Sequence, residues 1–378
     1  MQHGVKYVSL CEASGYGDAA RAYLLGLMRT GLPLTWTPMV GRRRLGPFYR
    51  PFTGRGVGDP ELDPLCNKPL FYDTVILHLV PEYFPVWKKR EIEKRVFGYT
   101  VWETDKLPAH WPPLLNMLDH LLVPSYWNKS VFAQSGISVP IDVIPHLISN
   151  PPPHTEELPC AVLSGDYVFY TIGTWTARKA IWDTVRCYLN TFSNADPVTL
   201  IIKTSTRDFT TRGLRALFSN TASTLHRITR TYRRPARILL VGREINAGQI
   251  FSLHSRGDCY ISLCRSEGWG LGAFNAAALG KPVIMTGFGG QLDYLLPEYA
   301  YLVDYTLVPV EDINGRPSYC KDQRWAEPSL SHASILMRHV FENREAAKER
   351  GQRLASYILA TFDNKRTIDR LINLLNAR

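Results

Sequence analysis

The feature that most constrains this 378-residue chain is an alternation of short apolar runs with amphipathic segments, which occurs twice in succession. In the first half, β-branched and apolar runs predict strands at 5–10, 74–80, 96–102, 120–124 and 141–145, and helices at 18–30 and 126–135. In the second half, they predict strands at 167–173, 198–204, 238–242, 259–264, 282–286 and 300–303, and helices at 178–192 and 271–279. Strands that alternate with helices form a parallel sheet covered on both faces, so the fold class is α/β.

A proline-rich segment separates the two series. Asn150 is followed by three prolines, which is typical of a stiff linker, and the chain is long enough for two cores. We therefore expect a first domain at 1–150, a linker at 151–160, a second domain at 161–350 and a helical tail at 351–378. The tail carries an apolar stripe of Ile368, Leu371, Ile372 and Leu375. The stretch 41–69, dense in Gly, Pro and Arg, predicts a long loop.

The composition is that of an ordinary globular protein, with 45% apolar and 21% charged residues. No run of eighteen apolar residues and no charged-then-apolar start is present, so we expect neither a spanning helix nor a signal peptide. The seven cysteines lack CxxC spacing and read as reduced, mostly buried thiols. These features predict a cytoplasmic protein without a metal site.

The net charge of +10 comes largely from three basic segments: Arg42–Arg44, residues 88–95, and the arginines between 227 and 237. Three interpretations compete for each: a solvated surface, a surface for anionic lipid heads or lipid diphosphates, and a nucleic-acid patch. Beside the first two segments lie the aromatics Phe48, Tyr49, Phe52, Tyr83, Phe84 and Trp87. They favour a peripheral membrane surface or an anionic acceptor. The sequence contains no recognisable motif of a nucleic-acid-binding module, so nucleic acid is not an expected partner.

Residues 258–290 have the pattern of an anion cradle that also carries an acid. A buried strand leads into the turn RSEGWG, and a small-residue helix follows and stops at Gly280. Free backbone N–H groups and the helix dipole favour an anion at such a turn. Glu267, at the mouth of the turn, would repel a phosphate but can accept hydrogen bonds from sugar hydroxyls. The combination indicates a sugar joined to a diphosphate.

This segment resembles the donor-site signature of retaining, family-four-type glycosyltransferases of the GT-B fold (glycosyl transferases group 1). That signature is an acid, seven residues and a second acid within an SEGxGL turn-helix. Here the first acid is Glu267, in the run from Ser266 through Gly268, Trp269 and Gly270 to Leu271, and the second position holds Asn275, roughly 7 Å along the helix. Residues 98–108, 123–136 and 139–146 look like N-terminal blocks of a bacterial-type branch of this family. The resemblance implies two Rossmann-like domains with a cleft between them and a C-terminal helix that crosses back.

The resemblance also implies roles for individual residues. Glu267 would meet the sugar, and Asn275 would meet the ribose with weaker bonds than Glu gives. Arg178 and Lys179, expected to open a helix, would neutralise the leaving diphosphate, unless they are only an exposed pair. Gly15 and Gly17 would let the diphosphate approach the backbone, or would merely form a tight turn. The family often has an arginine where Thr174 stands, a role that Arg178 or Arg243 would take over.

Acceptor-side candidates follow the buried strands of the first half. His78 ends one strand and is either a satisfied core residue or a contact for substrate. Trp102 ends another strand, and Glu103 and Asp105 follow it, where α/β proteins place ligands; Glu103 is a candidate for proton acceptance. Trp175 and Trp269 either stack on a ligand or pack in the core. Gly287, Gly289 and Gly290 form a second glycine turn, near the donor or as a structural strand exit.

The expected function is transfer of a sugar from a nucleoside diphosphate, with retention and without a metal or other cofactor. The expected acceptor is a glycan or lipid-linked precursor of a surface polysaccharide, reached from the inner face of the membrane. Two alternatives remain: a GT-B nucleotide-sugar epimerase, and a nucleotide-sugar-binding subunit without turnover, which Asn275 would explain. A glycosyltransferase that modifies nucleic-acid bases is a more distant third.

Overall fold

The computed structural model describes residues 4–41, 48–149, 156–158, 160–211, 219–312 and 314–377. The chain divides into two compact units. The N-terminal unit comprises Met1–Trp102, Lys106–Ser149 and Phe362–Arg378, and the C-terminal unit comprises Glu103–Asp105 and Asn150–Thr361. The predicted linker at 151–160 lies mostly outside the described residues, as do Arg42, Arg43 and Arg44.

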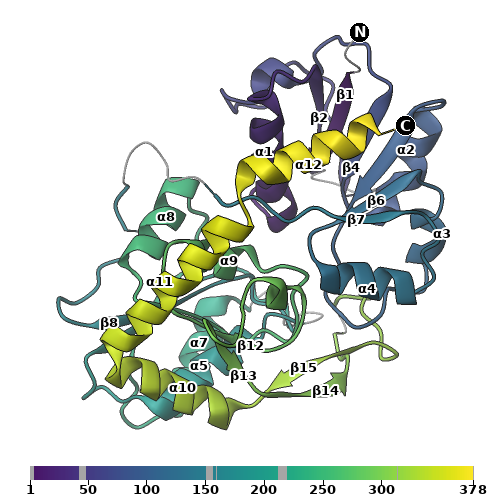
Figure 1. Ribbon diagram of the computed structural model, residues 1–378. Coiled ribbons are helices and arrows are strands. Elements are labelled where there is room, and N and C mark those ends of the chain that lie inside the picture. Colours follow the sequence, from purple (N-terminus) through teal and green to yellow (C-terminus); the bar gives the residue numbers. More distant parts are fainter. Residues whose placement is uncertain are drawn as a thin grey trace. The chain divides into compact units, whose positions relative to one another are not determined.

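Seven described strands form the sheet of the N-terminal unit, in the order β3-β2-β1-β4-β5-β6-β7 (Figure 1). Neighbouring strands are parallel, except that β3 runs antiparallel to β2. The strands are β1 (Val5–Leu10), β2 (Leu34–Gly41), β3 (Tyr49–Pro51), β4 (Thr74–His78), β5 (Arg95–Tyr99), β6 (His120–Val123) and β7 (Ile141–Val143). The helices are α1 (Gly15–Met28), α2 (Phe84–Arg90), α3 (Trp111–Leu115), α4 (Tyr126–Gln134) and α12 (Asn364–Asn376), with short 3-10 turns η1 (Asp63–Leu65) and η2 (Pro81–Tyr83).

Helix α12, the last of the described chain, completes the core of the N-terminal unit, where it lies beside α1 (Figure 1). Its apolar stripe, Ile368, Leu371 and Leu375, is buried among the residues of α1 and the sheet. Gly26 of α1 allows the close approach, because a Cβ there would lie 2.7 Å from Cδ1 of Ile368. The Asn364 side chain accepts a hydrogen bond from the N–H of Ile148 at 2.8 Å and thereby fixes the start of α12.

Six described strands form the sheet of the C-terminal unit, all parallel, in the order β10-β9-β8-β11-β12-β13. They are β8 (Tyr167–Ile172), β9 (Val198–Lys203), β10 (Arg237–Val241), β11 (Cys259–Ser262), β12 (Val283–Thr286) and β13 (Tyr301–Val303). The helices are α5 (Ile181–Thr191), α7 (Thr221–Thr229), α8 (Ala247–Arg256), α9 (Leu271–Ala278), α10 (Leu330–Glu342) and α11 (Arg344–Thr361), with the 3-10 turn η3 (Gly290–Asp293). A separate antiparallel hairpin pairs β14 (Tyr305–Pro309) with β15 (Arg324–Pro328).

In each unit the strand order reverses once. β1 has β2 on one side and β4 on the other, and β8 likewise has β9 on one side and β11 on the other. The loops that leave two such neighbours turn to opposite faces of the sheet and leave a crevice at their carboxyl ends, where ligands bind in open α/β sheets. The topology therefore singles out the loops after β1 and β4, and those after β8 and β11.

The predicted α/β fold with two parallel sheets is confirmed. Three local predictions were wrong. Helix α5 begins at Ile181, not Arg178, so Arg178 and Lys179 lie in the turn before it. The predicted loop at 41–69 contains β3 and η1. Strand β2 was missed because Pro38 interrupts its apolar pattern, yet β2 pairs with β1 along its length.

Candidate functional site

The reversal between β8 and β11 brings three predicted site residues together in the C-terminal unit. β8 leads into the turn that carries Arg178 and Lys179, and β11 leads into the turn that carries Glu267. Because these strands are neighbours, the two turns leave the same edge of the sheet side by side. The N–H of Arg265 donates to the carbonyl of Arg178 at 2.8 Å and joins the turns directly.

Four charged side chains meet here, and we call them the ion cluster: Glu103, Arg178, Lys179 and Glu267. Glu267 accepts from Arg178 Nη1 at 3.0 Å through Oε2, and from Lys179 Nζ through Oε1. Arg178 Nη1 also donates to the carbonyl of Ser266 at 2.8 Å, and its Nη2 lies 3.4 Å from Oε1 of Glu103. Both oxygens of the Glu267 carboxylate are therefore engaged by cations.

Burial and pairing act in opposite directions on the cluster. Burial raises the pKa of Glu267, but Lys179 and Arg178 lower it by more, so the net pKa lies below the ordinary value. Burial lowers the pKa of Arg178, but Glu103 and Glu267 raise it by more, so its net pKa lies well above the ordinary value. The pairing thus favours the charged forms of Glu267 and Arg178, and these two side chains are ionised at neutral pH.

The turn that holds the cations has an uncommon backbone. Ala180, immediately after Lys179, is fully buried and adopts the left-handed conformation with φ of 43°. An alanine seldom occupies this region, because its Cβ crowds the backbone. Thr176 stabilises the turn, since its carbonyl accepts from the Ala180 N–H at 3.0 Å. Such conformations persist where the surrounding structure enforces them, and they occur often at functional sites.

The tripeptide Glu103–Asp105 belongs to the C-terminal unit, although the residues on either side of it belong to the other. Glu103 accepts from the hydroxyl of Tyr319 at 2.8 Å, in addition to its pairing with Arg178. Asp105 accepts from the N–H of Arg324 at 2.6 Å and so joins β15. Glu103 is thus placed as a partner of Arg178, and Asp105 as a backbone anchor. Tyr319 had no signal in the sequence.

Helix α9 begins without a side-chain cap. Gly270 is its N-cap and has φ of 87°, a conformation that favours glycine, and no side chain bonds to the first N–H groups. Leu271 is the first residue of the helix, Gly268 is buried in the turn before it, and Asn275 lies half-buried one turn further on. The buried hydroxyl of Ser266 has no hydrogen-bond partner among the described residues. The first turn of α9 thus has no side-chain cap, and uncapped helix N-termini of this kind can bind anions.

The second glycine turn supports the first. Gly290 N–H donates to the carbonyl of Glu267 at 2.7 Å. At Gly289, with φ of 113°, a Cβ would lie 2.5 Å from the same carbonyl, so only glycine fits. Trp269 is buried against Phe274 and Tyr294, each at a ring distance of 5.0 Å. These contacts are the ones expected from structural roles. The Gly287–Gly290 turn supports the backbone of Glu267, and Trp269 packs in the core.

Arg265 is a site-forming residue that sequence reasoning missed. Its guanidinium donates to Glu327 at 2.7 and 2.9 Å, to Asp183 at 3.2 Å and to the carbonyl of Ala177 at 2.7 Å. It thereby ties the turn before α5 to β15. Its position in the turn after β11, two residues before Glu267, was the sequence signal that would have found it.

Arg243, the other predicted donor-binding residue of this unit, lies exposed after β10. It makes no ion pair or hydrogen bond recorded for the described residues, and it is not part of the ion cluster. The strand order explains this position, because β10 is the edge strand of the sheet, two strands away from β8.

In the N-terminal unit, the reversal between β1 and β4 joins Gly15, Gly17 and His78. The two glycines form the first turn of α1, capped by Ser14, and the Tyr16 ring between them lies 5.8 Å from that of His78. Gly17 is structurally required, since a Cβ would lie 1.9 Å from the carbonyl of Glu12. No described atom lies within 4 Å of the corresponding Cβ position at Gly15.

His78 is buried among aromatic rings. Its Nδ1 is 2.7 Å from the hydroxyl of Tyr7, and its ring lies 4.2 Å from that of Tyr99 and stacks on His146 at 6.4 Å. Burial, followed by the effect of His146, holds the pKa of His78 well below its ordinary value. His78 is therefore neutral, and its partners are those of a satisfied core histidine.

Trp102 and two aromatic residues beside the basic segment at 88–95 also serve packing. The Trp102 ring is buried 4.6 Å from that of Trp111, and its Nε1 donates to the carbonyl of Lys106 at 2.8 Å. Phe84 and Trp87 are buried as well, so they are not available to a membrane, whereas Val86 and Ile92 are exposed. Membrane contact stays a prediction. No helix among the described residues is long and apolar enough to cross a bilayer.

Comparison with known proteins identifies the fold. No protein-family model matches the sequence, and no curated protein sequence matches it. Solved structures do match. Sucrose-phosphate synthase from Thermosynechococcus elongatus has a TM-score of 0.70 at 13% identity, covering 99% of this chain and 98% of that one. Anabaena HepE in complex with UDP-glucose has 0.69 at 13% identity, covering 98% and 99%. A glycosyltransferase from Rickettsia africae has 0.67 at 12% identity, covering 99% and 97%. The chain therefore has the fold of the GT-B glycosyltransferases.

Proposed function

We propose that this protein is a retaining, metal-independent glycosyltransferase that moves a sugar from a nucleoside diphosphate to a glycan or lipid-linked acceptor. The observation that carries the proposal is the ion cluster beside the uncapped N-terminus of α9. Two cations and a row of free N–H groups are what a departing diphosphate requires. HepE, which has the same fold, is known in complex with UDP-glucose, and this supports a nucleotide-sugar donor.

The cluster suggests how the charges of the reaction are balanced. As the bond between the anomeric carbon and the phosphate oxygen breaks, negative charge grows on the diphosphate. Lys179 and Arg178 stabilise that charge without a metal ion. Lys179 has three N–H donors, of which Glu267 takes one, so donors remain for phosphate oxygens.

Glu267 acts in this proposal as a counter-charge and a sugar contact, and not as a nucleophile. A carboxylate has about four lone-pair sites, and two cations occupy two of them. The remaining sites can accept from sugar hydroxyls, but the paired charge makes attack on carbon unfavourable. Retention then requires that the acceptor oxygen enter on the face from which the diphosphate leaves, with the proton of the acceptor hydroxyl passing to the departing phosphate oxygen. Glu103, paired with Arg178 and Tyr319, holds Arg178 in position.

Nucleotide binding without metal is the first test. UDP, GDP, ADP, dTDP and CMP are compared by thermal shift in the presence of EDTA. We expect one nucleoside diphosphate to raise the melting temperature progressively with concentration, as ligand linkage requires. No shift with any nucleotide at millimolar concentration would contradict the proposal.

Lys179→Gln then tests the cation. We expect the variant to transfer sugar at least about a hundredfold more slowly, because it loses a charge aimed at the leaving group. Lys348→Gln, at an exposed position on α11, makes the same charge change away from the cluster and should keep full activity. Product stereochemistry, followed by NMR of the anomeric proton, tests retention directly.

A second candidate is a nucleotide-sugar-binding subunit without turnover. The observation that favours it is Asn275, since an amide on α9 cannot give the ribose the charge-assisted bonds of a carboxylate. Asn275→Glu separates the two functions. If the natural chain binds a nucleotide but transfers no sugar, and Asn275→Glu gains transfer, the natural protein is a nucleotide-sugar-binding subunit. If the natural chain and the variant both transfer sugar, the natural protein is a glycosyltransferase.

A further inference from the structure

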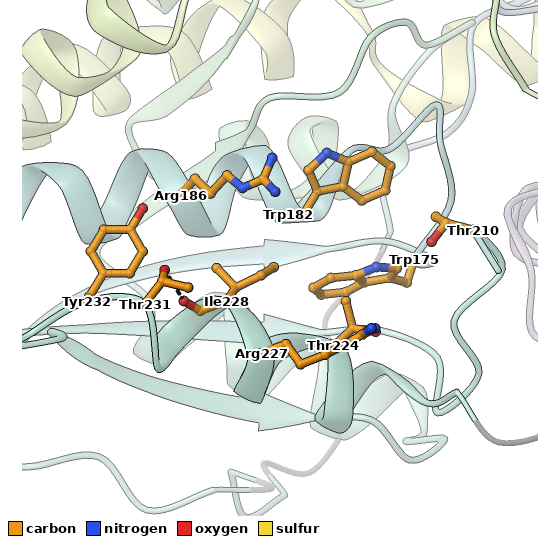
Figure 2. A pocket seen from close by; sticks show the side chains of 9 residues that line it. All are labelled: Trp175, Trp182, Arg186, Thr210, Thr224, Arg227, Ile228, Thr231 and Tyr232. Carbon is orange, nitrogen blue, oxygen red and sulfur yellow. Dashed lines mark hydrogen bonds between the residues drawn. The ribbon is translucent and has the colours of Figure 1, made fainter. Parts of the chain in front are cut away.

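A pocket of about 450 Å³ lies in the C-terminal unit and includes none of the ion cluster. Its volume falls within the roughly 300–1,000 Å³ of small-ligand sites. It is formed mainly by α5 and α7, with the segments beside them (Figure 2). The lining residues are Trp175, Trp182, Arg186, Thr210, Thr224, Arg227, Ile228, Thr231 and Tyr232.

Two indole rings make one wall of the pocket. Trp182 is half-buried, and its ring lies 6.5 Å from that of the fully buried Trp175. The Nε1 of Trp175 is buried and has no hydrogen-bond partner among the described residues. The apolar wall suits the C–H face of a sugar ring or another flat ring.

Two arginines from different helices stand at the rim. Arg186 of α5 is turned toward Trp182 in Figure 2, and it pairs only distantly with Asp183, at 3.7 Å. Arg227 of α7 is exposed and donates to Thr224 Oγ1 at 2.9 Å, with no carboxylate partner recorded for it among the described residues. Guanidinium groups with spare donors in a concave site select carboxylate, phosphate or sulfate oxygens.

The three threonine hydroxyls favour a ligand that also carries hydrogen-bond donors. Thr210 and Thr224 each donate to the buried carboxylate of Asp208 at 2.6 Å, and Thr231 donates to the carbonyl of Ile228 at 2.8 Å. A hydroxyl has one proton, and all three protons are committed, so toward the pocket these groups can only accept. A matching ligand must bring its own O–H donors.

We propose that this pocket binds an acidic carbohydrate, a sugar that carries carboxylate, phosphate or sulfate. Such a molecule supplies anionic oxygens to Arg186 and Arg227, hydroxyl donors to the threonines, and an apolar ring face to Trp182. A neutral sugar lacks the first of these, and inorganic phosphate lacks the ring face. The inference does not depend on the proposed transferase activity, because none of the ion cluster lines the pocket.

Titration calorimetry of the full chain at 0.15 M salt tests the proposal. The probes are tetragalacturonate, a heparin-derived tetrasaccharide, cellotetraose and inorganic phosphate. We expect at least one acidic tetrasaccharide to bind about tenfold or more tightly than cellotetraose or phosphate. Saturating UDP should leave that affinity unchanged. Equal binding of the neutral sugar, or no binding of either acidic one, would overturn the proposal.

Two matched variants locate the site. Arg227→Gln should weaken binding of the acidic tetrasaccharide about tenfold, since it removes a charged donor from the rim. Arg233→Gln changes the charge equally at an exposed position that does not line the pocket, and should weaken binding less than twofold. Equal losses in the two variants would show diffuse attraction to the basic surface and would overturn the proposal. So would tighter binding of an RNA tetranucleotide than of both acidic sugars.

Discussion

The two units use the same topological device and fill it with opposite chemistry. At the strand-order reversal of the C-terminal unit, Arg178, Lys179 and Glu267 lie in direct ion pairs. At that of the N-terminal unit, neutral rings surround His78, and Tyr7 bonds to it. Burial disfavours the charged forms of both Glu267 and His78. Lys179 and Arg178 overcome this effect on the pKa of Glu267, whereas no partner charge opposes it on the pKa of His78. The strand order thus places a site, and partner charges decide whether that site is ionised.

A substitution in the ion cluster of the C-terminal unit should have the largest effect on stability. Glu267→Gln keeps the shape of the side chain but leaves Lys179 and Arg178 without their shared counter-charge. Breaking a buried pair in this way should lower the free energy of unfolding by about 3 kcal/mol, measured by urea denaturation. Glu349→Gln, at an exposed position on α11, is the control and should have almost no effect. Equal stability of the two variants would mean that the cluster is not held by its charges.

Lowering the pH tests the neutral site of the N-terminal unit. Burial lowers the pKa of His146 to about 3, whereas an unfolded histidine titrates near about 6.5. The unfolded chain therefore binds the extra proton between these values, so the stability contribution is complete above pH 6.5 and is lost as pH falls toward 3. At pH 4.5 the loss from this residue should be about 2 to 3 kcal/mol.

Measuring unfolding free energy between pH 6 and pH 4 checks this expectation. His146→Gln should reduce the slope by about one proton, or roughly 1.4 kcal/mol per pH unit. His226→Gln, at an exposed position on α7, should keep the slope of the natural chain. An unchanged slope in His146→Gln would show that this ring is protonated in the folded state. The lowered pKa of Glu267 adds a loss that begins as pH falls through the ordinary glutamate range, and this loss cancels because it is the same in the natural chain and in both variants.

The smallest expected effect compares two buried alanines, one in each unit. Ala180→Gly relieves a left-handed backbone that costs alanine about 1 kcal/mol, while glycine gains a similar entropy in the unfolded chain. We expect a stability change within about 1 kcal/mol. Ala19→Gly, inside α1, relieves no strain and should destabilise by about 1 kcal/mol or more. Thermal melts of both variants measure the two changes in stability. Equal losses of stability would mean that the backbone of Ala180 is not strained.

The fold was largely predictable because its main signals are local. Each of β1, β4, β8, β9 and β11 is a largely apolar run that is almost entirely buried in a parallel sheet. Strand β2 was not predicted because Pro38 breaks its pattern, and the hairpin β14–β15 was not predicted because the long connection 310–323 separates its two strands. Such pairings are decided by tertiary contacts and not by local preference.

The site was predictable only where a turn carries its own signature. The run from Ser266 to Leu271 predicted Glu267, and the structure places it beside Arg178 and Lys179. Tyr319 reaches Glu103 across 216 residues of sequence, and no local pattern announces such a contact. The roles of Trp102 and His78 depended on their neighbours, which are other buried rings, and these too come from distant segments.

The position of α12 has a consequence for how the chain is made. Ile148 and Asn364 are hydrogen-bonded although 216 residues separate them, and Leu371 and Leu375 fill the core of the N-terminal unit. Synthesis normally lets early segments fold first. Here the first-made sheet must keep part of its apolar surface uncovered until nearly the whole described chain has been translated. The N-terminal unit therefore completes its core only after α12 has been made.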